Sequence, residues 1–205
     1  MLALGDGSAP ALKTDGSDFV TITGTNFGPA HDDSNATTIA SAINASYGGL
    51  YEVHGCEVIE AHKRMRCPSA EGVGRNHSWR VTVGDQTSAA SAVTTSYALP
   101  VVSGLSGAVV MDTRGNETVT ISGSNFGPAA ATATTATITS TVTAMYQNAL
   151  LRGLAGVAIK ALSCAVVVPH VKLVCTSAQG IGHGHRWMVT VGGQQSDWSA
   201  HTTSY

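Results

Sequence analysis

Short segments in which apolar and polar residues alternate recur along this chain, and they predict β-strands. The alternating segments are Val20-Thr-Ile22, Arg80-Val-Thr-Val83, Val119-Thr-Ile121 and Met188-Val-Thr-Val191. An apolar residue at every second position is typical of a strand with one buried face. Trp79 and Trp187 each lie just before such a segment, so we expect both indole rings to be part of a core.

Turn signals separate the predicted strands. Asn26-Phe-Gly-Pro29 and Asn125-Phe-Gly-Pro128 combine residues that end a strand and reverse the chain. Many short strands separated by turns predict an all-β sandwich. Residues Thr37 to Ala45 and Met145 to Ala161 are predicted as short helical turns.

The chain contains the same pattern twice. Gly16–Ala30 matches Gly115–Ala129 at an offset of 99, with 10 of 15 positions identical. Glu71–Tyr97 matches Gln179–Tyr205 at an offset of 108, with 16 of 27 identical. The change of offset places a nine-residue insertion between Ala129 and Cys164. The repeat therefore predicts two tandem β-sandwich domains, residues 1–98 and 99–205, with a connection of one or two residues.

The order of motifs is the same in both copies. In the second copy the motifs are Pro100-Val-Val, Gly115–Gly127, Cys164–Cys175, Gly180-Ile-Gly182, Val189-Thr-Val-Gly192 and Tyr205. In the first copy they are Gly16–Gly28, Cys56–Cys67, Gly72-Val-Gly74, Val81-Thr-Val-Gly84 and Tyr97. This order resembles the IPT/TIG family of immunoglobulin-like sandwiches, found in plexins, fibrocystin-like surface proteins and Rel-type transcription factors. The resemblance implies two tandem immunoglobulin-like domains.

The first copy departs from the pattern at its opening strand. Met1–Leu4 falls where the second copy has Pro100–Leu105, but it is short and has no proline. An incomplete first strand would leave a sheet edge with which another chain could pair. A frayed terminus or a trimmed fragment is the simpler interpretation.

Each copy carries two cysteines with ten residues between them, Cys56 with Cys67 and Cys164 with Cys175. In the second pair, apolar arms of equal length surround a Pro-His turn, which predicts facing cysteines on neighbouring strands within disulfide reach. Closing so short a loop stabilises a fold by roughly 3 kcal/mol. A zinc site is the alternative, but the sequence has no C-x-x-C motif. Disulfides indicate an oxidising compartment.

Charged residues make up only 12% of the chain, about half of the usual share. The net charge of −2 gives no electrostatic footprint for nucleic acid. No apolar run approaches the ~20 residues of a membrane helix, so we expect no direct membrane insertion by this segment. Its first residues, Met1–Gly7, lack the pattern of a signal peptide. We therefore expect either a cytosolic protein or a piece of a longer precursor, and the cysteines and the repeat favour the second.

Four Asn-x-Ser/Thr sequons predict N-glycosylation, at Asn35, Asn44, Asn76 and Asn116. Candidate O-glycosylation sites lie in a threonine-rich stretch, at Thr132, Thr134, Thr135, Thr137, Thr139, Thr141 and Thr143. Threonines are also good strand formers, so the stretch has a structural interpretation as well. Covalent glycans are the only non-protein groups that we expect, and we predict no cofactor.

Nothing in the sequence marks a catalytic or metal site. His183-Gly-His185 could place two imidazoles on one metal, but the first copy has Arg75 and His77 there, which favours a polar turn. The chain has no G-x-S-x-G, no phosphate-binding glycine loop and no H-E-x-x-H. We therefore expect a protein that is not an enzyme.

Three functions are compatible with a tandem sandwich, and fold alone does not choose among them. The favoured one is an extracellular structural or adhesive module, as a glycosylated subunit or fragment of a surface protein or a head-to-tail filament. Its expected partners are copies of itself or neighbouring repeats end to end, with other surface proteins or glycans as further candidates. The alternative is the ligand-binding ectodomain of a plexin- or fibrocystin-like receptor. Near-neutral charge and paired cysteines oppose the third, DNA binding.

Overall fold

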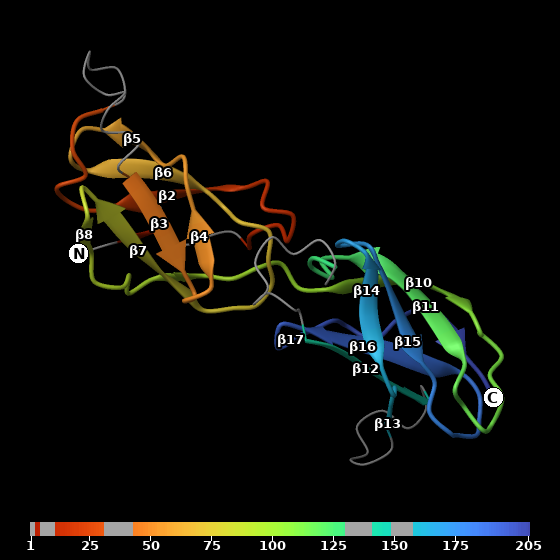
Figure 1. The fold of residues 1–205 in the computed structure, drawn as a ribbon. Coiled ribbons are helices and arrows are strands. Elements are labelled where there is room, and N and C mark those ends of the chain that lie inside the picture. Colours follow the sequence, from red (N-terminus) through yellow and green to blue (C-terminus); the bar gives the residue numbers. More distant parts are fainter. Residues whose placement is uncertain (1–2, 5–10, 31–42, 130–140, 149–157) are drawn as a thin grey trace. The chain divides into compact units, whose positions relative to one another are not determined.

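The computed structural model of the chain describes residues 3–4, 11–30, 43–129, 141–148 and 158–205. The chain divides into two compact units, Met1–Ala98 and Leu99–Tyr205 (Figure 1). Within the described ranges every regular element is a β-strand. The same ranges contain no helix of the length and apolarity that crossing a membrane requires.

Unit 1 is a sandwich of two antiparallel sheets. Its strands are β1 (Ala3–Leu4), β2 (Phe19–Thr23), β3 (Ile43–Tyr47), β4 (Tyr51–Val53), β5 (Glu57–Glu60), β6 (Arg64–Pro68), β7 (His77–Val83), β8 (Gln86–Thr87) and β9 (Thr94–Thr95). One sheet has the order β1-β2-β6-β5 and the other β4-β3-β7-β8, with β9 also paired to β7. This is the immunoglobulin arrangement, in which strands A, B, E and D form one sheet and C, F and G form the other. Here β1, β2, β6 and β5 correspond to A, B, E and D, and β4 is an additional strand beside β3.

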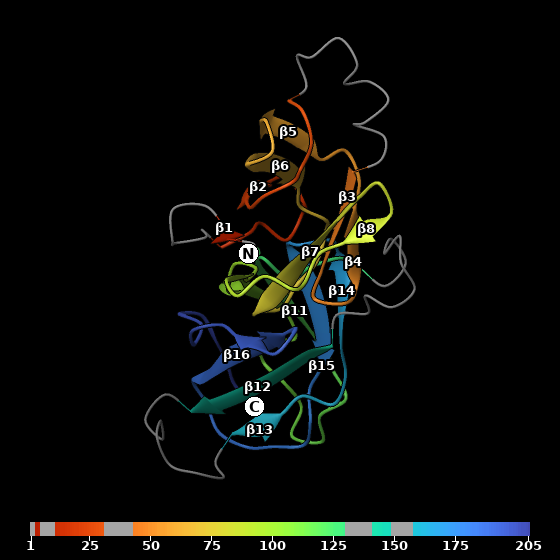
Figure 2. The same ribbon diagram turned by 90° about the vertical axis from the view of Figure 1, so that its left-hand side faces the viewer.

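Unit 2 repeats this topology. Its strands are β10 (Val101–Gly107), β11 (Thr118–Ser124), β12 (Val142–Asn148), β13 (Ile159–Lys160), β14 (Cys164–Val168), β15 (Lys172–Thr176), β16 (His185–Val191), β17 (Gln194–Gln195) and β18 (Thr202–Thr203). The sheets have the orders β10-β11-β15-β14 and β13-β12-β16-β17, with β18 paired to β16. Figure 1 shows the two sheets as separate layers, and Figure 2 shows β12 between β13 and β16. The chain is thus all-β, with two tandem immunoglobulin-like sandwiches.

The strands predicted from alternation are present in both units, as parts of β2, β7, β11 and β16. Their apolar positions face the core: Ile22 and Ile121 are both fully buried. The predicted turns are also present, and Asn26 and Asn125 adopt left-handed backbone angles with φ of 66° and 62°. Asparagine tolerates this conformation better than most residues, which explains why it begins each turn.

The prediction of helical turns is wrong wherever it can be compared with the structure. Residues 43–45 belong to β3, residues 145–148 belong to β12, and residues 159–160 form β13. Tyr47 lies opposite Trp79 of β7, and Tyr146 lies opposite Trp187 of β16. Those cross-strand contacts outweigh the local helical preference of these segments. Residues 37–42 and 149–157 lie outside the described residues.

The first unit has an opening strand at the place of Met1–Leu4, and it is short, as the sequence indicated. Leu4 of β1 pairs with Ile22, as Leu105 of β10 pairs with Ile121. The edge of β2 is therefore paired at Ala3 and Leu4. This two-residue strand compares with seven residues in β10.

A stacked tryptophan and tyrosine form the centre of each core. The ring of Trp79 stacks on Tyr47 with centroids 4.1 Å apart, and Trp187 stacks on Tyr146 at 4.3 Å. Both indoles are fully buried, as predicted. Each indole N–H donates to a threonine hydroxyl, Trp79 to Thr95 at 2.9 Å and Trp187 to its counterpart at 3.0 Å. Burial therefore leaves neither indole N–H without a partner.

Two tyrosine hydroxyls hold one backbone position in each unit. In unit 1 the Ala70 N–H donates to Tyr47 at 2.8 Å, and the Tyr97 hydroxyl donates to the Ala70 carbonyl at 2.8 Å. The two hydroxyls are 2.7 Å apart. Burial raises the pKa of the Tyr97 hydroxyl, so it stays protonated and remains a donor. A side chain at Gly72 would collide with the Tyr97 hydroxyl, which explains a glycine there.

Unit 2 builds the same contact with its own residues. The Ala178 N–H donates to Tyr146 at 3.0 Å, and Tyr205 donates to the Ala178 carbonyl at 2.6 Å. One ring differs between the units. Tyr51 pairs with Tyr47 in unit 1 and donates to the Val73 carbonyl, whereas Ile159 takes that place opposite Tyr146. Both units therefore anchor the loop before the tryptophan strand by the same pair of hydroxyls.

A buried histidine completes each aromatic cluster. His77 contacts Tyr97 edge to face, with centroids 5.6 Å apart, and its Nε2 lies 3.2 Å from the Val73 carbonyl. His185 contacts Tyr205 in the same way, and its Nε2 lies 3.2 Å from the Ile181 carbonyl. Burial lowers the pKa of both imidazoles, because a cation there would lose its hydration. Both rings are therefore neutral at pH 7.

Tyr97→Phe is expected to lower the free energy of unfolding of unit 1 by about 1–3 kcal/mol, because the half-buried Ala70 carbonyl loses its best donor. Tyr205→Phe should do the same to unit 2. Hydrogen–deuterium exchange on peptides from each unit measures the two effects separately. Unchanged protection of the mutated unit would contradict this role of the hydroxyls.

Acidification is expected to destabilise both units through the buried histidines. The folded-state pKa lies below the ordinary value of about 6.5, so the unfolded chain binds protons first as the pH falls below that value. Stability is therefore complete above about pH 6.5 and decreases below it. Urea denaturation at several pH values should show a shallower decrease in His77→Gln, whose amide can still donate to the Val73 carbonyl. An identical pH profile in the variant would show that His77 is not responsible.

Candidate functional site: the cysteine hairpins and glycan acceptors

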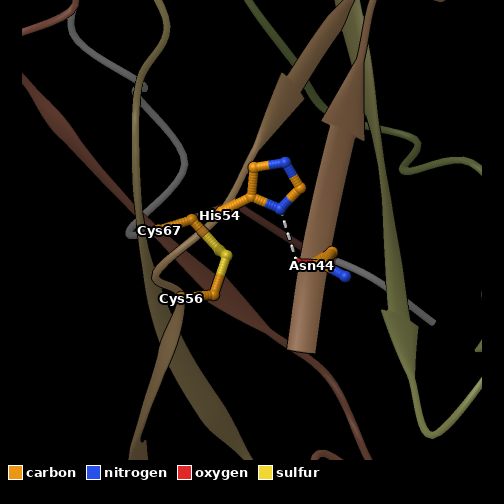
Figure 3. Close-up of a disulfide and its surroundings, with 4 residues drawn as sticks. All are labelled: Asn44, His54, Cys56 and Cys67. Atoms are coloured by element: carbon orange, nitrogen blue, oxygen red, sulfur yellow. Dashed lines mark hydrogen bonds between the residues drawn. A yellow bond between two sulfur atoms is a disulfide. The ribbon is translucent and has the colours of Figure 1, made fainter. Parts of the chain in front are cut away.

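Both predicted disulfides are present, and each bridges the first strand of a hairpin to the second. Cys164 lies directly opposite Cys175 in the register of β14 and β15, with Cα atoms 4.1 Å apart. Cys56 immediately precedes β5 and is bonded to Cys67 of β6, with Cα atoms 4.2 Å apart (Figure 3). All four cysteines are used in this way, so none remains as a thiolate ligand for zinc.

Asn44 lies beside the first disulfide on the outer face of its sheet. Its neighbours Ile43 and Ala45 are buried in the core, so the side chain of Asn44 points away from it. The His54 ring donates from Nδ1 to the Asn44 Oδ1 at 2.8 Å. Figure 3 shows the amide nitrogen on the side away from His54. This nitrogen is the atom to which an N-linked glycan attaches.

Two further sequons lie in exposed turns. Asn76 precedes β7 and has a φ of 60°, and Asn116 precedes β11 with a φ of 66°. Both side chains are exposed. At the position of Asn76 the second unit has Gly184, with a φ of 65°, so this turn needs a residue that accepts left-handed angles. Asn35 lies outside the described residues.

Only the end of the threonine-rich stretch falls in the described part. Thr141 and Thr143 are exposed, and Thr143 lies in β12 opposite Thr190. The strand register places Thr143 at the position of Asn44, because Asn44 lies opposite Thr82 and Thr82 is the counterpart of Thr190. The two units thus present a candidate glycan-acceptor side chain at the same place on the same sheet. Thr132, Thr134, Thr135, Thr137 and Thr139 lie outside the described residues.

The two neighbouring histidines of unit 2 have different environments. His183 is exposed, whereas His185 is buried in the aromatic cluster. Asn148 donates from its amide to the His183 carbonyl at 2.7 Å, which holds the turn. Across the described residues, no group of three or more histidine, cysteine or acidic side chains is close enough to hold a metal ion.

An exposed turn holds Asp112 in a network of hydrogen bonds with Arg114. Arg114 donates from its guanidinium and from its backbone N–H to Asp112, and the Arg114 Nη2 lies 2.9 Å from Asp112 Oδ2. These hydrogen bonds lower the pKa of Asp112 to about 2. The arrangement closes a turn two residues before the Asn116 sequon.

The hairpin of unit 1 carries a network of ion pairs on its outer face. Arg66 of β6 pairs with Glu57 of β5 at 3.8 Å and lies over the ring of Phe19. Glu60 pairs with Lys63 at 3.5 Å and with Arg64 at 3.7 Å. Charges of both signs therefore cover this hairpin.

The hairpin of unit 2 has the same register but almost no charge. Glu57, Glu60, Lys63 and Arg66 are replaced by Ala165, Val168, Val171 and Val174, and Arg64 by Lys172. Val168 and Val171 are 43% and 45% exposed, as is the bulged Val167 at 48%. Sequence analysis missed this contrast, although aligning the two hairpins at the offset of 108 would have shown it.

Comparison with known proteins finds no sequence relative. No family model matches the chain. A search of curated proteins also finds no match.

Solved structures with a similar arrangement include several extracellular proteins. They include the surface glycan-binding protein PbSGBP-B from Prevotella bryantii, at a TM-score of 0.49 and 12% identity, over 95% of this chain and 39% of that one. The adhesin InvE of Yersinia pseudotuberculosis matches at a TM-score of 0.44 and 11% identity, over 99% and 58%. The extracellular region of plexin A4 matches at 0.39 and 16% identity, over 100% and 18%. The chain spans less than two thirds of each of these proteins and is only distantly similar to them.

Proposed function

We propose that the chain is an extracellular, non-enzymatic structural or adhesive module made of two IPT/TIG-like domains, residues 1–98 and 99–205. The observation that carries the proposal is the division of labour among its polar residues. The tyrosine pair, the histidine and the serine that the two units share serve the scaffold, and the hairpin charges and sequons that differ lie on outer faces or in turns. Tyr51 is the exception, because it is buried in unit 1 and has Ile159 as its counterpart. Such a protein combines a stable, repeated scaffold with a surface that differs between the repeats.

The shared polar side chains hold backbone and core in place. Both tyrosine pairs bind the alanine before the tryptophan strand, and both histidines face a backbone carbonyl. Ser91 and Ser199 receive the backbone N–H of the two tryptophans at 2.9 Å. Side chains with these roles are not available to bind a substrate, which supports a structural function.

Disulfides and glycan acceptors support an extracellular location. A disulfide in each small sandwich is stable in an oxidising compartment and would be reduced in the cytosol. Asn44 lies on the outer face of the central strand β3, and Asn76 and Asn116 lie in exposed turns, where a glycan meets no core. Glycans on these residues would supply the polar surface that the few charged residues do not.

Glycosylation is tested by secretion of the chain from a eukaryotic cell and measurement of its intact mass before and after glycosidase treatment. We expect a decrease on treatment, and a loss of one glycan in each of Asn44→Gln, Asn76→Gln and Asn116→Gln. Ser46→Ala should lose the glycan at Asn44 while that asparagine remains, and Ser46→Thr should keep it. A mass that the enzyme does not change would contradict the proposal.

We also propose contacts of the module with copies of itself or with neighbouring repeats end to end. The duplication supports this, because the first copy is already followed in the chain by the second across Ala98 and Leu99. A heterologous contact that does not close generates a filament. Electron microscopy of the natural material should therefore show filaments or a surface layer, and dispersed monomers alone would refute the contact.

A further inference from the structure

We propose that the β14–β15 hairpin of unit 2 is a self-association surface through which two copies of the chain pair about a twofold axis. The surface, which we call the hairpin patch, consists of Ala165, Val167, Val168, Val171 and Val174. This contact goes beyond the proposed function, because it joins copies side by side through one unit rather than end to end.

The equivalent hairpin of unit 1 provides an internal reference for a solvated surface. It has the same register, the same disulfide and the same irregularity, which lies after Val58 in one unit and after Val166 in the other. Ion pairs cover the unit 1 hairpin, as expected for a surface that stays in water. At the bulge the two units are alike, because Ile59 is 41% exposed in unit 1 where unit 2 has Val167. At the other four positions of the patch unit 1 has charged residues, so the shared scaffold does not require apolar residues there and they need another explanation.

The backbone at the edge of the patch is open to pairing. β14 is the last strand of its sheet among the described strands, with β15 as its only neighbour. The Thr176 N–H donates to the Ser163 carbonyl and the Thr176 carbonyl accepts from Leu162, so the backbone groups of Thr176 point toward the β14 side. Two residues along β15, Val174 also points that way and lies opposite Ala165. Cys164 and Val166 then fall at the alternate positions, and their N–H and C=O groups point away from β15. These groups can pair with a strand of another chain.

The residues of the edge do not oppose such pairing. An exposed apolar edge strand is a template for another strand, and natural sheets usually protect it with charges. Glu57 and Glu60 supply those charges on β5, and β14 has none. The bulge at Val167 restricts the pairing to the Cys164–Val166 part of the strand, and the exposed valines beyond it supply apolar contact.

The charge pattern favours a second copy over an unrelated partner. A twofold contact brings a surface against itself, so a charge near the axis meets its own like charge. A different protein could provide opposite charges and would not require the loss of both signs. Relative to unit 1, the hairpin patch has apolar residues in place of two acidic and two basic ones. Lys172 is the one charged residue beside it. This is the pattern that a self-complementary contact needs.

The test uses the complete 205-residue chain and restores the unit 1 residues to unit 2, as Ala165→Glu, Val168→Glu, Val171→Lys and Val174→Arg together. Unit 1 accommodates these side chains on the same scaffold, so the variant is expected to fold. Sedimentation velocity over a concentration series should show dimers of the wild type at about 100 µM. Burial of the introduced charges should weaken the dimer at least about 100-fold.

The reciprocal variant is the matched control. Glu57→Ala, Glu60→Val, Lys63→Val and Arg66→Val together give unit 1 a second apolar hairpin, which should increase association beyond the dimer. A wild type that stays monomeric, or a dimer that the four charges do not weaken, would overturn the proposal. Measurement before and after glycosidase treatment keeps this result independent of the glycosylation proposal, and the end-to-end contact is tested on other material.

Discussion

The hydrogen-bonded pair of tyrosines is the contact on which the rest of each unit depends. Tyr47 comes from β3, Tyr97 from the end of the unit, and Ala70 from the loop between β6 and β7. These segments belong to different parts of the chain, and the two hydroxyls satisfy both backbone groups of one half-buried alanine. Without these hydroxyls the N–H and C=O groups of Ala70 would lose their hydrogen-bond partners, which costs free energy where water is excluded.

The tryptophan and histidine positions follow from this anchor. Because Tyr47 is held in place, Trp79 can stack on it, and the imidazole of His77 fills the remaining space against Tyr97. The same three-part arrangement in unit 2 uses Tyr146, Trp187 and His185. The two units therefore share the same central core contacts, whereas their surface residues differ.

The two hairpins show how strongly the surfaces of the two units differ. Their disulfides and registers are the same, yet one hairpin carries salt bridges and the other exposes valines. Exposed ion pairs stabilise a fold by only about 0–1 kcal/mol each, so replacing them costs the scaffold little. The change matters for what each surface can contact, and this is why we assign self-association to unit 2.

The amino-acid sequence by itself determined the repeat, the strands with strict alternation, the turns and the cysteine pairs, because these depend on local chemistry and on short spacings. It misled at β3, β12 and β13, which were predicted as helical turns and which form strands by pairing with β7, β16 and β12, respectively. Only the tertiary structure showed that His185 is buried while His183 is exposed, and that Thr143 occupies the place of Asn44. Burial and the choice of sheet face depend on the partners that a strand finds across the sandwich, and these partners are distant in the chain.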